Sequence, residues 1–105
     1  MKVLWLYRIN TVNKTVRKVI VKKDDLLALQ KLVGGYLERI PHAPLQHDVF
    51  VDKEALLKDN GDGFFTFNGH GPYKGNGVVI GLDSKFNTVE PTLTLEAISK
   101  KVKFL

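Results

Sequence analysis

Residues 24–40 read DDLLALQKLVGGYLERI, and the rest of the chain is organised around this stretch. Its apolar residues recur at helical spacing and form one stripe, at Leu26, Leu29, Leu32 and Val33. Two aspartates precede the stripe, where carboxylates satisfy the free N–H groups of a helix start. Gly34 and Gly35 follow it, where glycine can end a helix in the left-handed conformation. The pattern predicts a helix over residues 24–34, followed by an extended segment.

The 105 residues have the composition of one globular domain, with 44% hydrophobic and 26% charged residues. The absence of cysteine excludes disulfides and thiolate metal sites and favours an intracellular setting. No apolar run is long enough to cross a bilayer, so we expect a cytoplasmic protein without a membrane partner. The net charge of +5 is uneven, because residues 1–40 are basic and residues 41–99 are acidic.

Apolar residues with strand-like patterns predict a series of strands, at 2–9, 15–23, 36–41, 48–52, 64–67 and 78–82. Residues 54–58 fit either a single helical turn or the second arm of a hairpin. Residues 59–63 (DNGDG) predict a hairpin turn. Thr94 is a candidate N-cap, and the spacing after it predicts a C-terminal helix over residues 94–104. This order predicts one α+β domain over residues 1–105, with a mostly antiparallel sheet.

Three strings resemble an uncharacterised family, namely LQKLVGGYLE, DVFVDKEALLK and GNGVVIGLD. It is a domain-of-unknown-function family of small proteins common in phages, prophages and plasmids, with an LQxLVGG-(I/L)E core motif. The resemblance covers residues 24–83, and the segment FFTFNGHGPYK is longer and richer in glycine than the family pattern. The resemblance implies a small α+β fold and an origin in a mobile element. It brings no catalytic residues to this chain.

Residues 68–77 (NGHGPYKGNG) predict a mobile, glycine-rich loop. The loop lacks the Gly-Lys-Ser/Thr of a P-loop, but it concentrates backbone N–H groups beside an imidazole, an aromatic ring and a cation. These groups suit an anionic or nucleotide-like ligand. The candidate ligand-binding residues are His70, Tyr73, Lys74 and Asn76, and a flexible connection without function is the alternative.

The usual signatures of metal binding and catalysis are not found in the sequence. The DNGDG segment lacks a calcium loop's first acid and last glutamate, since Lys58 and Gly69 occupy those positions. His42, His47 and His70 have no helical ligand spacing and no cysteine partners. No nucleophile–base order stands out either. We therefore expect no catalytic residues, no metal site and no cofactor.

The N-terminal hairpin is basic and carries two aromatic residues, Trp5 and Tyr7. Aromatic rings among cations on a sheet suit single-stranded nucleic acid, whose bases stack and whose phosphates pair with lysine or arginine. The candidate nucleic-acid-binding residues are Arg8, Lys14, Arg17, Lys18 and Lys22. The alternative is that the aromatic residues belong to the core and that the cations only face water.

The sequence thus predicts a non-enzymatic binding protein of phage or mobile-element origin, active in the host cytoplasm. We expect it to counteract host defence, either by sequestering a nucleotide-type signal or by blocking a host protein. The alternative function is a nucleic-acid-binding accessory protein that uses the basic hairpin. The sequence leaves open whether the chain forms a homo-oligomer.

Overall fold

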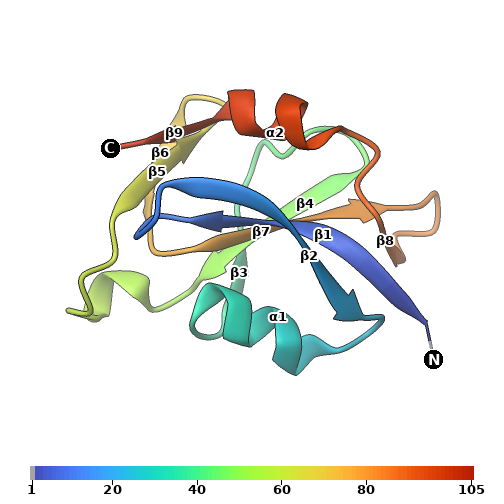
Figure 1. The fold of residues 1–105 in the computed structure, drawn as a ribbon, viewed down its shortest axis with the longest axis horizontal. Helices are drawn as coiled ribbons and strands as arrows, with labels where there is room; N and C mark the ends of the chain where they lie inside the picture. Colours follow the sequence, from blue (N-terminus) through green and yellow to red (C-terminus); the bar gives the residue numbers. More distant parts are fainter. Residues whose placement is uncertain (1) are drawn as a thin grey trace.

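The computed structural model describes residues 2–105 and builds two antiparallel sheets and two α-helices from them (Figure 1). The predicted α+β class is therefore confirmed. The elements in chain order are β1 (Val3–Asn10), β2 (Thr15–Lys22), α1 (Leu26–Val33), β3 (Leu37–Arg39), β4 (His47–Asp52), the 3-10 helix η1 (Ala55–Leu57), β5 (Phe64–Phe67), β6 (His70–Lys74), β7 (Gly77–Leu82), β8 (Thr88–Val89), α2 (Leu95–Lys101) and β9 (Val102–Phe104).

The larger sheet has the strand order β2-β1-β7-β4-β3, with β8 paired to β7. Strand β7 lies between β1 and β4, and its first five residues are buried because both faces of the sheet are covered there. The strand predicted at residues 78–82 is thus confirmed, as β7. Strand β2 is an edge strand, so one side of its backbone has no partner strand.

The large sheet is covered on both faces (Figure 1). Helix α1 packs on one face, where Leu29 and Leu32 contact a core of residues from β1 and β7. The small sheet and α2 cover the other face, around Phe65, Phe67 and Ile98. Because the helix and the small sheet lie on opposite faces, the two cores are separated by the large sheet itself.

Helix α1 begins and ends as its sequence predicts. The Asp25 side chain caps the start by accepting a hydrogen bond from the Ala28 N–H at 3.1 Å. Gly34 ends the helix in the left-handed conformation, with φ of 95°. Both signals are local in sequence, which explains why the helix could be predicted from them.

The predicted loop over residues 68–77 is wrong in more than half of its length, because residues 70–74 form strand β6 and Gly77 begins β7. Asn68 and Gly69 both have positive φ and join β5 to β6 as a two-residue hairpin turn. The small sheet has the order β6-β5-β9, so β6 is at an edge, where Pro72 is tolerated.

The predicted C-terminal helix is also too long. Thr94 caps the start of α2, but the helix ends at Lys101 and the last residues form β9. Strand β9 pairs with β5, so Val102 and Phe104 pack against the core around Phe65 and Phe67 instead of extending the helical stripe. Pairing with a distant strand thus overrides the helical spacing.

Residues 59–63 do not form the predicted hairpin turn, because they lead from η1 into β5 and so connect the large sheet to the small one. Of the two alternatives for residues 54–58, the single helical turn is confirmed, as η1.

Candidate functional site

Tyr73 and Lys74, two of the predicted ligand-binding residues, line one small pocket. Its volume is about 80 Å³, and Glu38, Asp52 and Lys53 contribute to its wall. The Tyr73 ring lies 5.7 Å from the Phe65 ring and is half-buried. Burial, and then the negative charge of Glu38, raise the pKa of the Tyr73 hydroxyl. A nearby carboxylate makes this pocket a poor environment for an anion.

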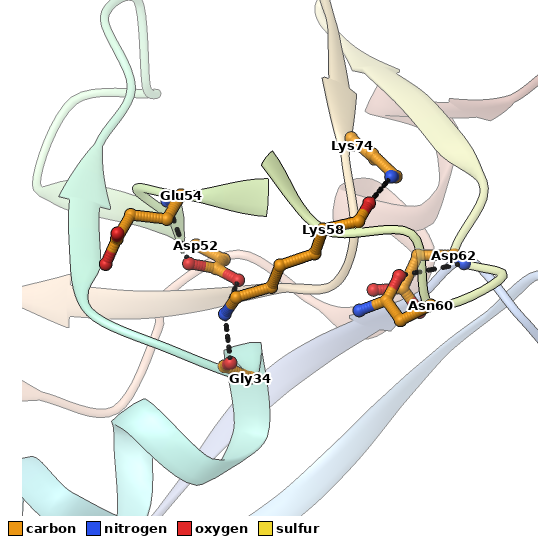
Figure 2. A network of polar contacts seen from close by, with 7 residues as sticks. All are labelled: Gly34, Asp52, Glu54, Lys58, Asn60, Asp62 and Lys74. Atoms are coloured by element: carbon orange, nitrogen blue, oxygen red, sulfur yellow. Dashed lines mark hydrogen bonds and ion pairs between the residues drawn. The ribbon is translucent and has the colours of Figure 1, made fainter. Parts of the chain in front are cut away.

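Lys74 and Asn76 already have partners within the protein. The Lys74 Nζ donates a hydrogen bond to the Lys58 carbonyl oxygen (Figure 2). The Asn76 Oδ1 accepts a hydrogen bond from the Thr11 N–H at 2.9 Å. These contacts tie the β6–β7 segment to its neighbours, so both side chains stabilise the fold whether or not they bind a ligand.

His70 does not join Tyr73 and Lys74 in the pocket wall. It is exposed and stacks on His42, with ring centroids 4.2 Å apart and an interplanar angle of 17°. The third histidine, His47, is buried, and its Nε2 accepts a hydrogen bond from the Leu93 N–H at 3.3 Å. Within residues 2–105, no three His, Asp or Glu side chains come together as a metal site.

Asp52, which lines the pocket of Tyr73 and Lys74, is the centre of a polar corner (Figure 2). The buried Asp52 carboxylate accepts hydrogen bonds from the Lys58 Nζ at 2.7 Å and from the Glu54 N–H at 2.9 Å. The Lys58 Nζ also donates to the Gly34 carbonyl oxygen at 2.9 Å. The hydrogen bond that Lys58 donates to Asp52 is the main cause that raises the pKa of Lys58. The corner joins the end of α1 to β4 and η1, so we assign it a structural role.

The basic hairpin places cations on both faces of the β2 edge. Arg17 points to the same face as the side chains that meet α1, whereas Lys18 and Lys22 point to the other face. All three side chains are exposed, as is Lys14 in the turn. The five candidate residues therefore form no single cluster, and only Arg8 and Arg17 are brought together.

Arg8 and Arg17 are directly opposite each other in the β1–β2 pairing. They line one groove of about 130 Å³, together with Asn10, Asn13 and Thr15. The Arg8 Nε donates a hydrogen bond to the Leu32 carbonyl oxygen at 3.1 Å, which fixes the half-buried guanidinium at the end of α1. The three polar residues were not predicted, although strand alternation places Asn10 and Thr15 on the face of the two arginines.

No carboxylate neutralises this pair in the part of the chain that the structure describes. The ion pairs found there are Arg39–Asp48, Lys58–Asp52 and Lys100–Glu96, and all of them lie outside the hairpin. Like charges directly opposite each other on a sheet repel. The arginine groove is therefore the strongest candidate for an anion site.

The two aromatic residues of β1 are not free to stack on bases. Tyr7 is buried, and its hydroxyl donates a hydrogen bond to the Leu93 carbonyl oxygen at 2.8 Å. Trp5 packs against the same core and is covered by Lys18, whose Nζ lies 4.5 Å from the ring centroid. Any aromatic contact to a ligand must come from another element.

The chain belongs to the family described as domain of unknown function DUF3846, whose model matches residues 5–102. This confirms the predicted resemblance to an uncharacterised family. No curated protein and no solved structure matches the chain. The described helices α1 and α2, of eight and seven residues, are both too short to cross a membrane.

Proposed function

We propose that this DUF3846 chain is a non-enzymatic protein that binds nucleic acid through its β1–β2 hairpin. The observation that carries the proposal is the Arg8–Arg17 pair. The two arginines are directly opposite each other in the strand pairing, line one groove and have no carboxylate partner among residues 2–105. A phosphate in the groove would turn this repulsion into attraction.

The chemistry of arginine favours phosphate as the ligand group. A guanidinium is a planar fork of N–H donors that matches phosphate oxygens, and it stays charged at every physiological pH. The Arg8 side chain is held by its hydrogen bond to the Leu32 carbonyl oxygen, so part of its conformational entropy is already lost before a ligand binds. Asn10, Asn13 and Thr15 place further hydrogen-bonding groups around the same groove.

The length of the edge favours a polymer over a single phosphate. Strand β2 has eight residues and therefore extends over about 26 Å, a distance that covers several backbone phosphates. Cations are exposed along this whole length, at Lys14, Arg17, Lys18 and Lys22. A nucleic acid backbone lying along the open edge of β2 would meet Arg17 on one face and Lys18 and Lys22 on the other.

Protection of the sheet edge is the competing explanation for these cations. Charged side chains on an edge strand prevent it from pairing with a second copy. That role predicts that removing the charges causes aggregation but changes no binding. Nucleic acid binding predicts a loss of affinity in a protein that stays monomeric.

The test is fluorescence anisotropy with labelled single-stranded and duplex oligonucleotides at low salt. We expect binding that weakens steeply with salt, because each phosphate contact releases counterions. The double variant Arg17→Gln/Lys18→Gln should weaken binding about tenfold or more and reduce the salt slope by about one to two. Size-exclusion chromatography of the same samples reports aggregation.

The matched control removes equal charge from another surface. Lys100 and Lys103 are exposed and belong to α2 and β9, outside the hairpin. The variant Lys100→Gln/Lys103→Gln should bind almost like the wild type. An equal loss of affinity in both double variants would mean that only the net charge of the protein matters. If the wild type shows no binding at low salt, the proposal is refuted.

A second proposal keeps the nucleotide-type ligand near Tyr73 and Lys74, in a phage or other mobile-element protein that counteracts host defence. Both residues line one pocket, which is the observation in its favour. The volume of about 80 Å³ is well below the roughly 300–1,000 Å³ of small-molecule sites, so we rank this proposal second. Thermal-shift screening with cyclic and linear nucleotides tests it, and a melting temperature that does not change at high ligand excess would exclude it.

A further inference from the structure

Phe86 has a backbone conformation that a phenylalanine rarely adopts. It lies in the turn between β7 and β8, with φ of 64°, in the left-handed region. A residue with a bulky side chain is strained in this region, whereas glycine or asparagine adopts it at little energetic cost. The Phe86 side chain is also 81% exposed, so burial does not offset the strain.

The turn is held by Asp83 and not by the Phe86 ring. The Asp83 Oδ1 accepts hydrogen bonds from the N–H groups of Asn87 at 2.8 Å and Lys85 at 2.9 Å. The Phe86 N–H donates to the Asp83 carbonyl oxygen at 3.0 Å. These bonds use only backbone groups of residues 85–87. Folding would therefore be served better by glycine at position 86, and an exposed aromatic residue kept under strain indicates a function.

The surroundings of this turn hold several lysines together with carboxylates, since Asp24, Asp25 and Glu90 line the same pockets as Thr88. Lys85 directly precedes Phe86, and the charge of Lys23 helps to lower the pKa of Asp83, after the hydrogen bonds from Asn87. Thr88, two residues beyond Phe86, lines one pocket with Lys22 and another with Lys2 and Lys23. The turn therefore lies near the end of β2, on the side of the molecule that holds the N-terminus (Figure 1).

We propose that Phe86 is a stacking platform for an unpaired base of a single-stranded nucleic acid whose phosphates follow the β2 edge. This inference rests on the proposed function and adds the strand type that the protein prefers. An exposed ring at a turn can stack on a splayed base but not on a base inside a duplex. The neighbouring lysines would meet the phosphates on either side of that base. Phe86 thus supplies the aromatic contact that Trp5 and Tyr7, which belong to the core, do not.

The experiment compares Phe86→Leu, Phe86→Trp and Phe86→Gly with the wild type. Anisotropy is measured with a 12-nucleotide single strand and with the duplex of the same sequence. We expect Phe86→Leu to lose about 5-fold to 100-fold in single-strand affinity, the range for losing one stacked base, with duplex affinity unchanged. Phe86→Trp should keep the wild-type affinity. The salt slope should stay the same in Phe86→Leu, because a stacked ring releases no counterions.

Phe86→Gly separates function from stability. Its melting temperature should rise by roughly 2–8 °C, because glycine relieves the strain of the left-handed conformation. Its single-strand affinity should nevertheless fall as far as that of Phe86→Leu. A variant that is more stable and binds less well cannot be explained by damage to the fold.

Two results would overturn the stacking proposal while leaving the proposed function intact. In the first, Phe86→Leu and Phe86→Gly keep the single-strand affinity of the wild type, while Arg17→Gln/Lys18→Gln weakens binding. This is the result expected if Phe86 contacts a protein instead of a base. The other is an equal loss for single-stranded and duplex DNA. A wild-type protein that binds neither oligonucleotide would refute both proposals together.

Discussion

At the corner built on Asp52, the buried carboxylate has a lysine 2.7 Å away and a backbone N–H at 2.9 Å. By contrast, Arg8 and Arg17 lie directly opposite each other in the β1–β2 pairing and have no ion-pair partner among residues 2–105. The corner joins α1, β4 and η1, and the charges of Asp52 and Lys58 are paired with each other. At the edge, Arg8 donates a hydrogen bond to the Leu32 carbonyl oxygen of α1, but no cation of the hairpin forms an ion pair within residues 2–105. Charge that the fold requires is thus paired inside the protein, and the unpaired charge of the edge is available to a ligand.

The sharpest way to break the corner is to add one methyl group at Gly35. A Cβ there would lie 2.8 Å from both the Asp52 Cγ and the Lys58 Nζ. We expect Gly35→Ala to lower the free energy of unfolding by about 2–3 kcal/mol, the upper part of the roughly 1–3 kcal/mol range for overpacking a dense site. Urea denaturation followed by circular dichroism measures this change.

Gly34→Ala is the matched control for that change. Gly34 has φ of 95°, but a Cβ there would have no atom within 4 Å. It should therefore cost only the strain of the left-handed conformation, about 1–2 kcal/mol. If Gly34→Ala proves the more damaging of the two, the close contact with the Asp52–Lys58 pair is not what requires a glycine at position 35.

Alkaline pH should weaken the corner specifically. The folded-state pKa of Lys58 is raised above its ordinary value of 10.5, chiefly by the hydrogen bond with Asp52. Its contribution to stability is therefore complete below that ordinary value and is lost as the pH rises through the folded-state pKa. The melting temperature of the wild type should fall toward that of Lys58→Met as the pH rises past about 10.5.

The control for this titration is Lys53→Met, which removes an exposed lysine close in sequence. Its melting temperature should run parallel to that of the wild type across the same pH range. If Lys58→Met also runs parallel to the wild type, the ion pair contributes nothing that depends on the lysine proton.

The features that could be predicted from the sequence are those whose cause is local. The ends of α1 follow from Asp25 and Gly34, which act on the adjacent backbone. Strand β6 was missed because glycine and proline disfavour strands, although Asn68-Gly69 is itself a hairpin signal. Strand β9 was missed because only its pairing with β5 ends α2.

The candidate site divides in the same way. The excess of cations in the hairpin can be read from the sequence, but the pairing of Arg8 with Arg17 depends on the length of the turn between the strands. The Asp52–Lys58 ion pair depends on the path of η1, and no spacing rule connects residues six positions apart in an irregular segment. Phe86 is an ordinary residue in the sequence, and it is set apart by an exposed ring at a left-handed backbone position, which only the structure shows.

The smallest expected effect is a stabilisation of the protein, and it concerns the edge strand β2. Removing one of two facing like charges should stabilise the free protein, because the cross-strand repulsion disappears. We expect Arg17→Gln to raise the free energy of unfolding by about 0.5 kcal/mol at low salt, and the gain should shrink as salt screens the pair. Lys103→Gln, which removes one charge from β9, is the control and should change stability less.

An Arg17→Gln variant that is more stable but binds nucleic acid less well would show that the Arg17 charge destabilises the free protein and contributes to binding. Edge protection alone could not explain that combination, since it predicts no loss of binding. If Arg17→Gln instead destabilises the free protein at low salt, Arg17 makes a favourable contact within the chain. The Arg8–Arg17 pair would then belong with the Asp52 corner, as charge that the fold itself uses.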